Sequence, residues 1–148
     1  MLRRVMGVMV AALLTLPAVA VTPAAARKHH SVHFVTWAVK ALGSSQYQHT
    51  RGKVFRHCKS APTGDVVADF RGHGLKPRDQ VTGTWFLNGH RYSSHTFRWG
   101  HGKGNIFNFA LRSSDGTTPV PDGSFVLRVS VNGKRAAHKS LKLVARAC

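Results

Sequence analysis

Two stretches of this chain place apolar residues, with Gly83 in one of the positions, at every second position and then reach the dipeptide Asn-Gly. This holds for 125–131, which leads to Asn132-Gly133, and for 81–87, which leads to Asn88-Gly89. Alternation with period two is typical of a strand with one buried face, and Asn-Gly suits the type I′ turn, whose two central residues both have positive φ. The sequence therefore predicts two β-hairpins. Their returning strands are expected at His90–Trp99 and Lys134–Val144.

Further apolar sets with the same spacing predict more strands. They are Val66, Ala68 and Phe70; Phe107, Phe109 and Leu111; and Leu141 and Leu143. Turn-forming segments at 74–79 and 113–123 separate them, and short strands at such regular spacing favour a sandwich or barrel. We find no repeat and no linker, so 27–148 is predicted to be one all-β domain. Ser31–Gly43 fits both a strand and a helical stripe, and its β-branched residues favour the strand.

Residues 1–26 have the pattern of a signal peptide. Arg3 and Arg4 precede the uncharged apolar run Val5–Leu16, and small residues follow at 24–26. We expect cleavage after Ala26, with Ala20 as the alternative site. The mature chain, which has no second apolar stretch of spanning length, is then expected to be secreted, either extracellular or periplasmic.

The charge balance is strongly basic. The chain has 22 Lys and Arg against five acidic residues, all of them Asp, and two of the cations lie in the predicted leader. A net charge of this size attracts polyanions and repels copies of the same molecule. Because the cations are spread over the whole mature chain, a disordered basic tail does not account for them.

The chain has two cysteines, Cys58 and Cys148. In an oxidising compartment they are expected to form one disulfide. Closing so long a loop stabilises a fold by roughly 4–5 kcal/mol on the loop-entropy model. No Cys-x-x-Cys spacing supports a metal site at these residues.

Three segments resemble the immunoglobulin-like β-sandwich domains of secreted bacterial proteins. They are the turn Gly74-Leu75-Lys76-Pro77-Arg78-Asp79, the stretch Trp85-Phe86-Leu87-Asn88-Gly89, and Pro121-Asp122-Gly123-Ser124-Phe125 continuing to Val129-x-Val131-Asn132-Gly133-Lys134. The resemblance covers Val66 to Val144 and implies a single antiparallel immunoglobulin-like sandwich. It carries little information on function. The positions of Cys58 and Cys148 differ from those of the disulfide that links facing strands in antibody domains.

Catalytic patterns are weak. Asp79, Asp115 and Asp122 lie in turn contexts, Asp65 begins a predicted strand and Asp69 lies on its outer face. These positions do not suggest the paired carboxylates of a hydrolase. There is no Gly-x-Ser-x-Gly motif either, so we expect a protein without enzymatic activity.

Ten histidines are scattered along the chain. Cleavage after Ala26 would place His29 third in the mature chain. A free amine, two backbone amides and this imidazole can form a square-planar nitrogen set for Cu(II) or Ni(II), with His30 and His33 as added ligands. A secreted copper- or nickel-binding protein is therefore one functional hypothesis.

Basic and aromatic residues are interleaved between positions 90 and 103. Regular alternation would place Arg91, His95, Phe97 and Trp99 on one side of the strand and Tyr92 and Arg98 on the other. We predict a polyanion-binding patch of Arg91, Arg98, Lys103 and Trp99, although burial in the core is the commoner fate of Phe97 and Trp99. The partner would be an anionic wall polymer, glycan, lipid head group or nucleic acid. A structural or adhesive module without a specific ligand is the third hypothesis.

Overall fold

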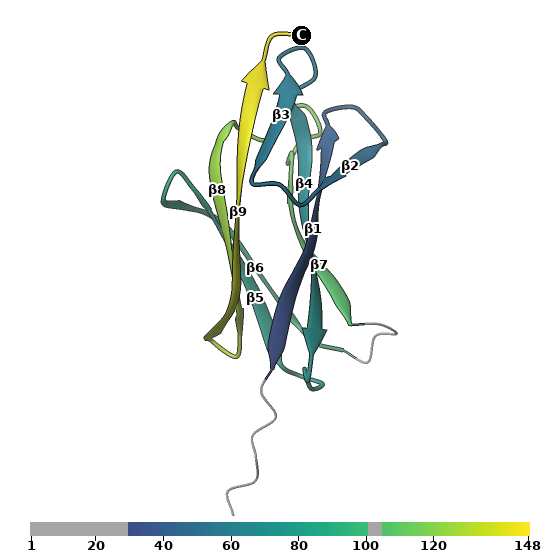
Figure 1. The fold of residues 1–148 in the computed structure, drawn as a ribbon. Coiled ribbons are helices and arrows are strands. Elements are labelled where there is room, and N and C mark those ends of the chain that lie inside the picture. The colour runs from purple at the N-terminus through teal and green to yellow at the C-terminus, as the bar shows by residue number, and fades with distance from the viewer. Residues whose placement is uncertain (1–29, 101–104) are drawn as a thin grey trace, which may run out of the picture.

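The computed structural model describes residues 30–100 and 105–148, which form two packed β-sheets (Figure 1). The four-stranded sheet has the order β2-β1-β4-β7 and the five-stranded sheet the order β3-β9-β8-β5-β6. The strands of this part of the chain are β1 (Ser31–Ala41), β2 (Tyr47–Thr50), β3 (Val54–Cys58), β4 (Thr63–His73), β5 (Gln80–Leu87), β6 (His90–Arg98), β7 (Ile106–Arg112), β8 (Gly123–Val131) and β9 (Lys134–Arg146).

Both predicted hairpins are confirmed. β5 pairs with β6 and β8 with β9, each antiparallel and each across an Asn-Gly turn. The φ angles are 49° at Asn88 and 87° at Gly89, and 51° at Asn132 and 79° at Gly133. Positive φ at both central residues is the geometry that the Asn-Gly pairs predicted.

The ambiguous segment Ser31–Gly43 contains strand β1, not a helix. It pairs with β4 along its whole length, and a register shift between Phe34 and Thr36 leaves Val35 without a partner on β4. This bulge lets both Phe34 and Trp37 reach the interior, where their ring centres are 5.0 Å apart. A regular strand would have sent residues 34 and 37 to opposite faces.

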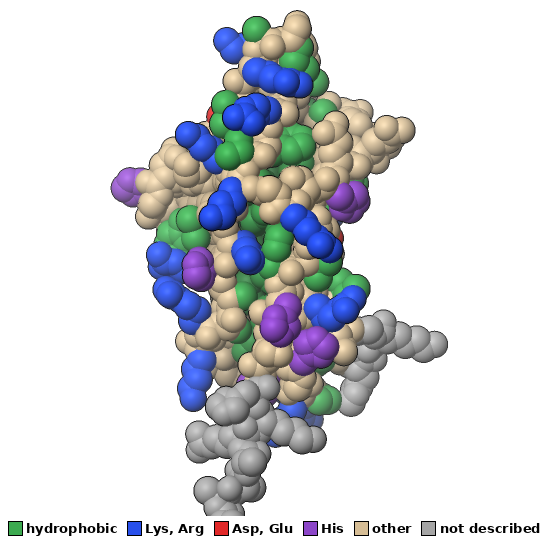
Figure 2. Space-filling model, viewed as in Figure 1, with side chains coloured by type: hydrophobic (Ala, Val, Ile, Leu, Met, Phe, Trp, Pro, Cys, Tyr) green, Lys and Arg blue, Asp and Glu red, His purple; other side chains and the backbone are tan. Residues whose placement is uncertain are grey.

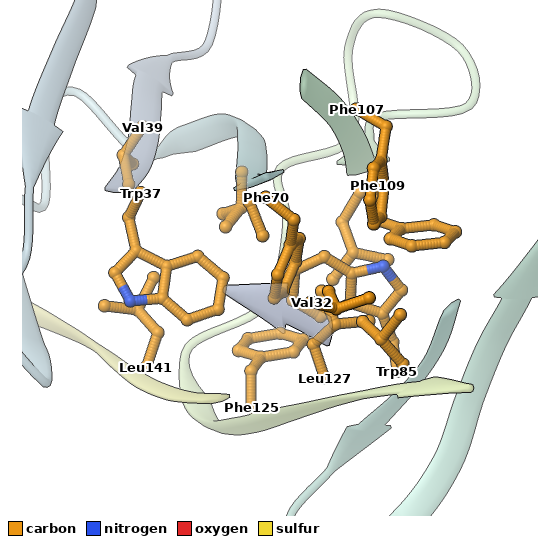
Figure 3. Packing of buried hydrophobic residues seen from close by; sticks show 14 of the residues in the cluster. Val32, Trp37, Val39, Phe70, Trp85, Phe107, Phe109, Phe125, Leu127 and Leu141 are labelled. Carbon is orange, nitrogen blue, oxygen red and sulfur yellow. The ribbon is translucent and has the colours of Figure 1, made fainter. Parts of the chain in front are cut away.

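The core lies between the two sheets and contains all the predicted inward-facing sets (Figure 3). Trp37 from the four-stranded sheet and Trp85 from the five-stranded sheet are 1% and 2% exposed, with ring centres 6.0 Å apart. Phe70 is completely buried and packs against Phe107 and Phe109, with ring centres 5.7 and 6.5 Å away. Burying each such side chain stabilises the fold by about 1.5–3 kcal/mol.

One pairing departs from the predicted antiparallel sandwich. β3 runs parallel to β9, from Val54 opposite Lys142 to Cys58 opposite Arg146. The predicted disulfide between Cys58 and Cys148 is confirmed, with the two Cα atoms 5.5 Å apart. It joins the end of the edge strand to the chain end within one sheet, unlike the antibody-type disulfide between facing sheets.

The predicted signal peptide, 1–26, lies outside the described residues. Among the residues that are described, no helix is long and apolar enough to cross a membrane.

Candidate functional site

The outer face of the five-stranded sheet is set by the registers of its two hairpins. The inward residues of β5 and β8 include Val81, Trp85, Leu127 and Val129, all of them buried. Alternate residues must therefore point to solvent. Across the sheet they form rows such as Thr96–Thr82–Ser130–Arg135 and Ser94–Thr84–Arg128–His138.

We call five of the cationic residues in this outward set, which come from three strands, the cationic face. They are Arg91 and Arg98 of β6, Arg128 of β8, and Arg135 and Lys142 of β9. All five are exposed, and within residues 30–100 and 105–148 none lies within ion-pair distance of a carboxylate. At about 4.8 Å between strands, the face is about 14 Å wide from β6 to β9. That width can accommodate a linear polymer.

Hydroxyl groups and one aromatic ring lie between these cations. Thr82 and Thr96 share a hydrogen bond of 2.8 Å, and Thr84 and Ser94 one of 3.1 Å. The guanidinium carbon of Arg128 lies 4.3 Å from the centre of the Phe86 ring. A guanidinium stacked in this way is held in place while its N–H groups remain available to an anion.

All five carboxylate side chains of the protein lie in the described part of the chain, and none is on the cationic face. Two are on β4 of the opposite sheet. Burial alone would raise the pKa of Asp65, but a hydrogen bond from the Tyr47 hydroxyl (2.8 Å) and the Lys40 ammonium (3.1 Å) outweigh it and lower that pKa. Burial raises the pKa of Asp69, against a weaker opposing effect of His49.

The other three carboxylates are engaged in turns and loops. The backbone N–H of Lys76 donates to Asp79 and lowers its pKa, assisted by the amide of Asn132. The backbone and hydroxyl of Thr118, followed by Thr117 and Ser113, lower the pKa of Asp115 far below its usual range. Asp122 accepts a hydrogen bond of 2.6 Å from Nε2 of His57. Four of the five carboxylates thus have hydrogen-bond or ion-pair partners away from the cationic face.

The structure regroups the residues predicted for the polyanion patch. A register shift in β6 leaves Tyr92 unpaired, so Arg91 lies opposite Phe86 on the outer face together with Arg98. The expected grouping of Arg91 with His95 and Phe97 is therefore wrong. Phe97 faces the core instead, 5.8 Å from both Phe107 and Phe109.

The other two predicted members of the patch do not join this face. Trp99 is partly buried, packs edge-on against Phe107 at 5.7 Å, and exchanges backbone hydrogen bonds with Arg78 and Asp79. It belongs to the edge of the core. Lys103 lies outside the described residues.

Sequence analysis missed Arg128, Arg135 and Lys142 as neighbours of Arg91 and Arg98. The Asn132-Gly133 turn places Arg135 opposite Ser130, and a register shift between Val129 and Ser130 then brings Lys142 opposite Ser124, with Arg128 between them on β8. The pairing of β5 with β8 then brings the two hairpins together. The sequence contains the signal for the turn, but it shows neither the register shift nor the pairing of β5 with β8.

The predicted metal-binding residues are not gathered in the described structure. His29 lies outside it. Nδ1 of His30 donates to the carbonyl oxygen of Gly74 at 2.8 Å, and His33 packs edge-on against His73 at 5.8 Å. Among the described residues, no three His, Cys, Asp or Glu side chains come close enough to hold a metal ion. The amino-terminal copper or nickel site stays a prediction.

The two sheets and their packing define an immunoglobulin-like β-sandwich. A solved structure of an immunoglobulin-like protein from Pseudomonas aeruginosa matches with a TM-score of 0.52 and 14% sequence identity. The match covers 81% of this chain and 100% of that one. The CARDB domain of a Pyrococcus furiosus protein, solved in complex with di-metal ions, matches with a TM-score of 0.41 and 12% identity. That match covers 80% of this chain and 94% of the other.

No family model matches the chain, and no curated protein matches its sequence. The likeness to the Pseudomonas aeruginosa protein is one of fold, since 14% identity does not carry a function from one protein to another.

Proposed function

We propose that this chain is an exported, non-catalytic binding module whose partner is an anionic polymer outside the cytoplasmic membrane. The carrying observation is the cationic face: five unpaired Lys and Arg side chains on one sheet surface that contains no carboxylate. Binding of a repeating anion to such a surface releases counterions and needs no closed pocket.

Export is supported by the predicted leader and by the disulfide. Disulfides form and persist in oxidising compartments, and Cys58–Cys148 is compatible with an extracellular or periplasmic location. The signal-peptide pattern at residues 1–26 predicts how the chain would be exported.

The carboxylates have structural roles, and this favours a binding function over a catalytic one. General acid–base chemistry needs a titratable group within reach of the reacting atoms. Here Asp79 and Asp115 organise turns, and Asp65 is satisfied by Tyr47 and Lys40.

The hydroxyl rows favour a sulfated or phosphorylated glycan within the class of anionic polymers. Such chains carry both charged groups and sugar hydroxyls, and the face offers cations with Thr and Ser hydroxyls between them. Wall polymers with phosphate groups and nucleic acids satisfy the charge but use the hydroxyls less fully.

Retention on immobilised heparin at increasing salt tests the proposal. If all five cations contact anionic groups, the logarithm of the binding constant should fall with the logarithm of salt concentration with a slope of about −4. The affinity should therefore drop by roughly two orders of magnitude between 50 and 200 mM salt. Elution below 50 mM salt would contradict the proposal and leave the structural or adhesive module as the better hypothesis.

A further inference from the structure

A hollow in the described part of the molecule lies on another side of the sandwich. It has a volume of about 540 Å³ and is built by β1, β4, β9 and the β2–β3 connection. We call it the edge groove. Its lining residues are His33, Phe34, Val35, Trp37, Arg51, Lys53, Arg71, Lys139 and Ser140.

The residues that line the groove indicate that it runs along the edges of two strands, β1 and β9. His33, Phe34 and Val35 are consecutive residues of β1, and Lys139 and Ser140 are consecutive residues of β9. Neighbouring side chains of a strand point to opposite faces. Consecutive residues of one strand line the same hollow where that hollow runs along the strand's edge, because both faces and the backbone are accessible there.

These edges lack a neighbouring strand because β2 and β3 are short. β2 ends with Thr50 opposite Trp37, so within the described chain β1 from Ser31 to Thr36 pairs only with β4. β3 begins with Val54 opposite Lys142, so the preceding part of β9 pairs only with β8. Residues 51–53 cross from one sheet to the other above the groove.

The groove combines a positive rim with an apolar floor. Arg51, Lys53, Arg71 and Lys139 surround it, and none of the carboxylates in the protein lines it. Trp37 and Phe34 form the floor, and the Lys139 ammonium is held 5.3 Å from the centre of the Phe34 ring. Figure 2 shows this face, with Lys and Arg side chains on both sides of hydrophobic surface near its middle.

From these features we propose that the edge groove binds an extended acidic peptide segment of a partner protein, added as a strand beside β1. Backbone groups along residues 31–36 would pair with the segment, and the floor would receive its inward-facing apolar side chains. The outward-facing carboxylates would meet the positive rim.

The positive charge around the edge groove favours an acidic peptide over a second copy of this chain. Cations along an edge strand are a common protection against self-pairing, because two such edges repel each other. An acidic strand experiences attraction at the same positions. The bulge at Val35 also disfavours a long regular addition, so we expect a short segment of about six residues, roughly 20 Å.

The probe is the blocked peptide acetyl-(Glu-Val)4-amide, and the measurement is calorimetric titration of the mature protein. We expect saturable binding of one peptide per chain. Two analogues sharpen the test, one N-methylated at every valine and the other at every glutamate. The N–H groups of alternate residues point to opposite edges of a strand, so one analogue should bind at least tenfold more weakly than the other.

Matched protein variants locate the site. R71Q combined with K139Q removes two rim charges and should weaken peptide binding at least fivefold. R91Q combined with R98Q removes two charges from the cationic face and should leave peptide binding unchanged while weakening heparin binding. The heparin result reports on the proposed function separately from the groove.

Three outcomes would overturn the inference. One is the absence of saturable peptide binding, another is equal affinity of the two N-methylated analogues, and the third is equal weakening by the two pairs of substitutions. Equal affinity of the analogues would mean that charge alone holds the peptide.

Discussion

Arg128 on β8 stacks over Phe86 on β5, with 4.3 Å between the guanidinium carbon and the ring centre. This contact links the two hairpins on their solvent side and fixes a cation near the middle of the cationic face. A half-buried aromatic residue on the outer side of a sheet therefore has a defined partner, and its effect on ligand binding can be separated from net charge.

The substitution Phe86→Leu should weaken heparin binding although it removes no charge. A contact of this kind is worth about 0.5–1 kcal/mol at an exposed site, which corresponds to roughly a two- to fivefold loss of affinity. The same substitution in an Arg128→Ser background should have no further effect. A full additional loss in that background would show that Phe86 does not act through Arg128.

The substitution Cys148→Ser should lower the free energy of unfolding by about 2–5 kcal/mol in chemical denaturation. The disulfide ties the short parallel strand β3 to the end of the chain, so its loss frees one edge of the five-stranded sheet. Mass spectrometry of exported protein should show a mass two hydrogens below the reduced form. Alkylation of both thiols without a reductant would contradict the bond.

The substitution Asp65→Asn should lower stability at pH 7 by about 1–2 kcal/mol, because the carboxylate is hydrogen-bonded and paired with Lys40. The pKa of Asp65 in the folded protein lies below its ordinary value of 3.8. Its stabilising contribution is therefore fully present well above pH 3.8 and is lost as pH falls through the folded-state pKa. The difference between wild type and variant should shrink over that acid range in thermal or urea unfolding.

Asp69, on the same strand as Asp65, serves as a control with the opposite expected dependence of stability on pH. Burial raises its pKa, so its ionised form is disfavoured in the folded protein, and stability is lost as pH rises from 3.8 through the folded-state pKa. Asp69→Asn should be neutral at low pH and stabilising at pH 7. Parallel behaviour of the two variants would show that the environments of these carboxylates are assigned wrongly.

The substitution Gly83→Ala should destabilise the fold by about 1–3 kcal/mol through overpacking. Gly83 lies within the inward-facing set of β5, and a Cβ at this position would overlap the ring of the buried Phe109. The second substitution Phe109→Leu should recover part of the lost stability. An unchanged midpoint in urea for Gly83→Ala would contradict this packing.

The sequence predicts the sandwich well because its strongest signals are local. Alternation places Phe125 and Leu127 in the core, and the Asn-Gly pairs fix both hairpin turns. The disulfide follows from the presence of two cysteines in a chain whose first 26 residues predict export.

Sequence patterns do not predict the features that depend on a β-bulge or on pairing between segments far apart in the chain. The bulge at Val35 changes which residues of β1 face inward, and the one at Tyr92 moves Arg91 to the outer face. Neither position carries a Gly or another bulge signal. The parallel pairing of β3 with β9 and the adjacency of β5 and β8 arise from tertiary packing, so the cationic face and the edge groove become visible only in the folded molecule.

The most direct test of the central claim compares two triple variants with equal loss of charge. Arg91, Arg98 and Arg128 are changed to Ser in one, and Lys59, Lys76 and Arg78, exposed residues outside the cationic face, are changed to Ser in the other. Heparin affinity is measured at several salt concentrations. We expect the first variant to lose about 2–3 units of the slope of log affinity against log salt, and the second to lose less than one. Equal losses would show that net charge holds the polymer and that the cationic face is not a site.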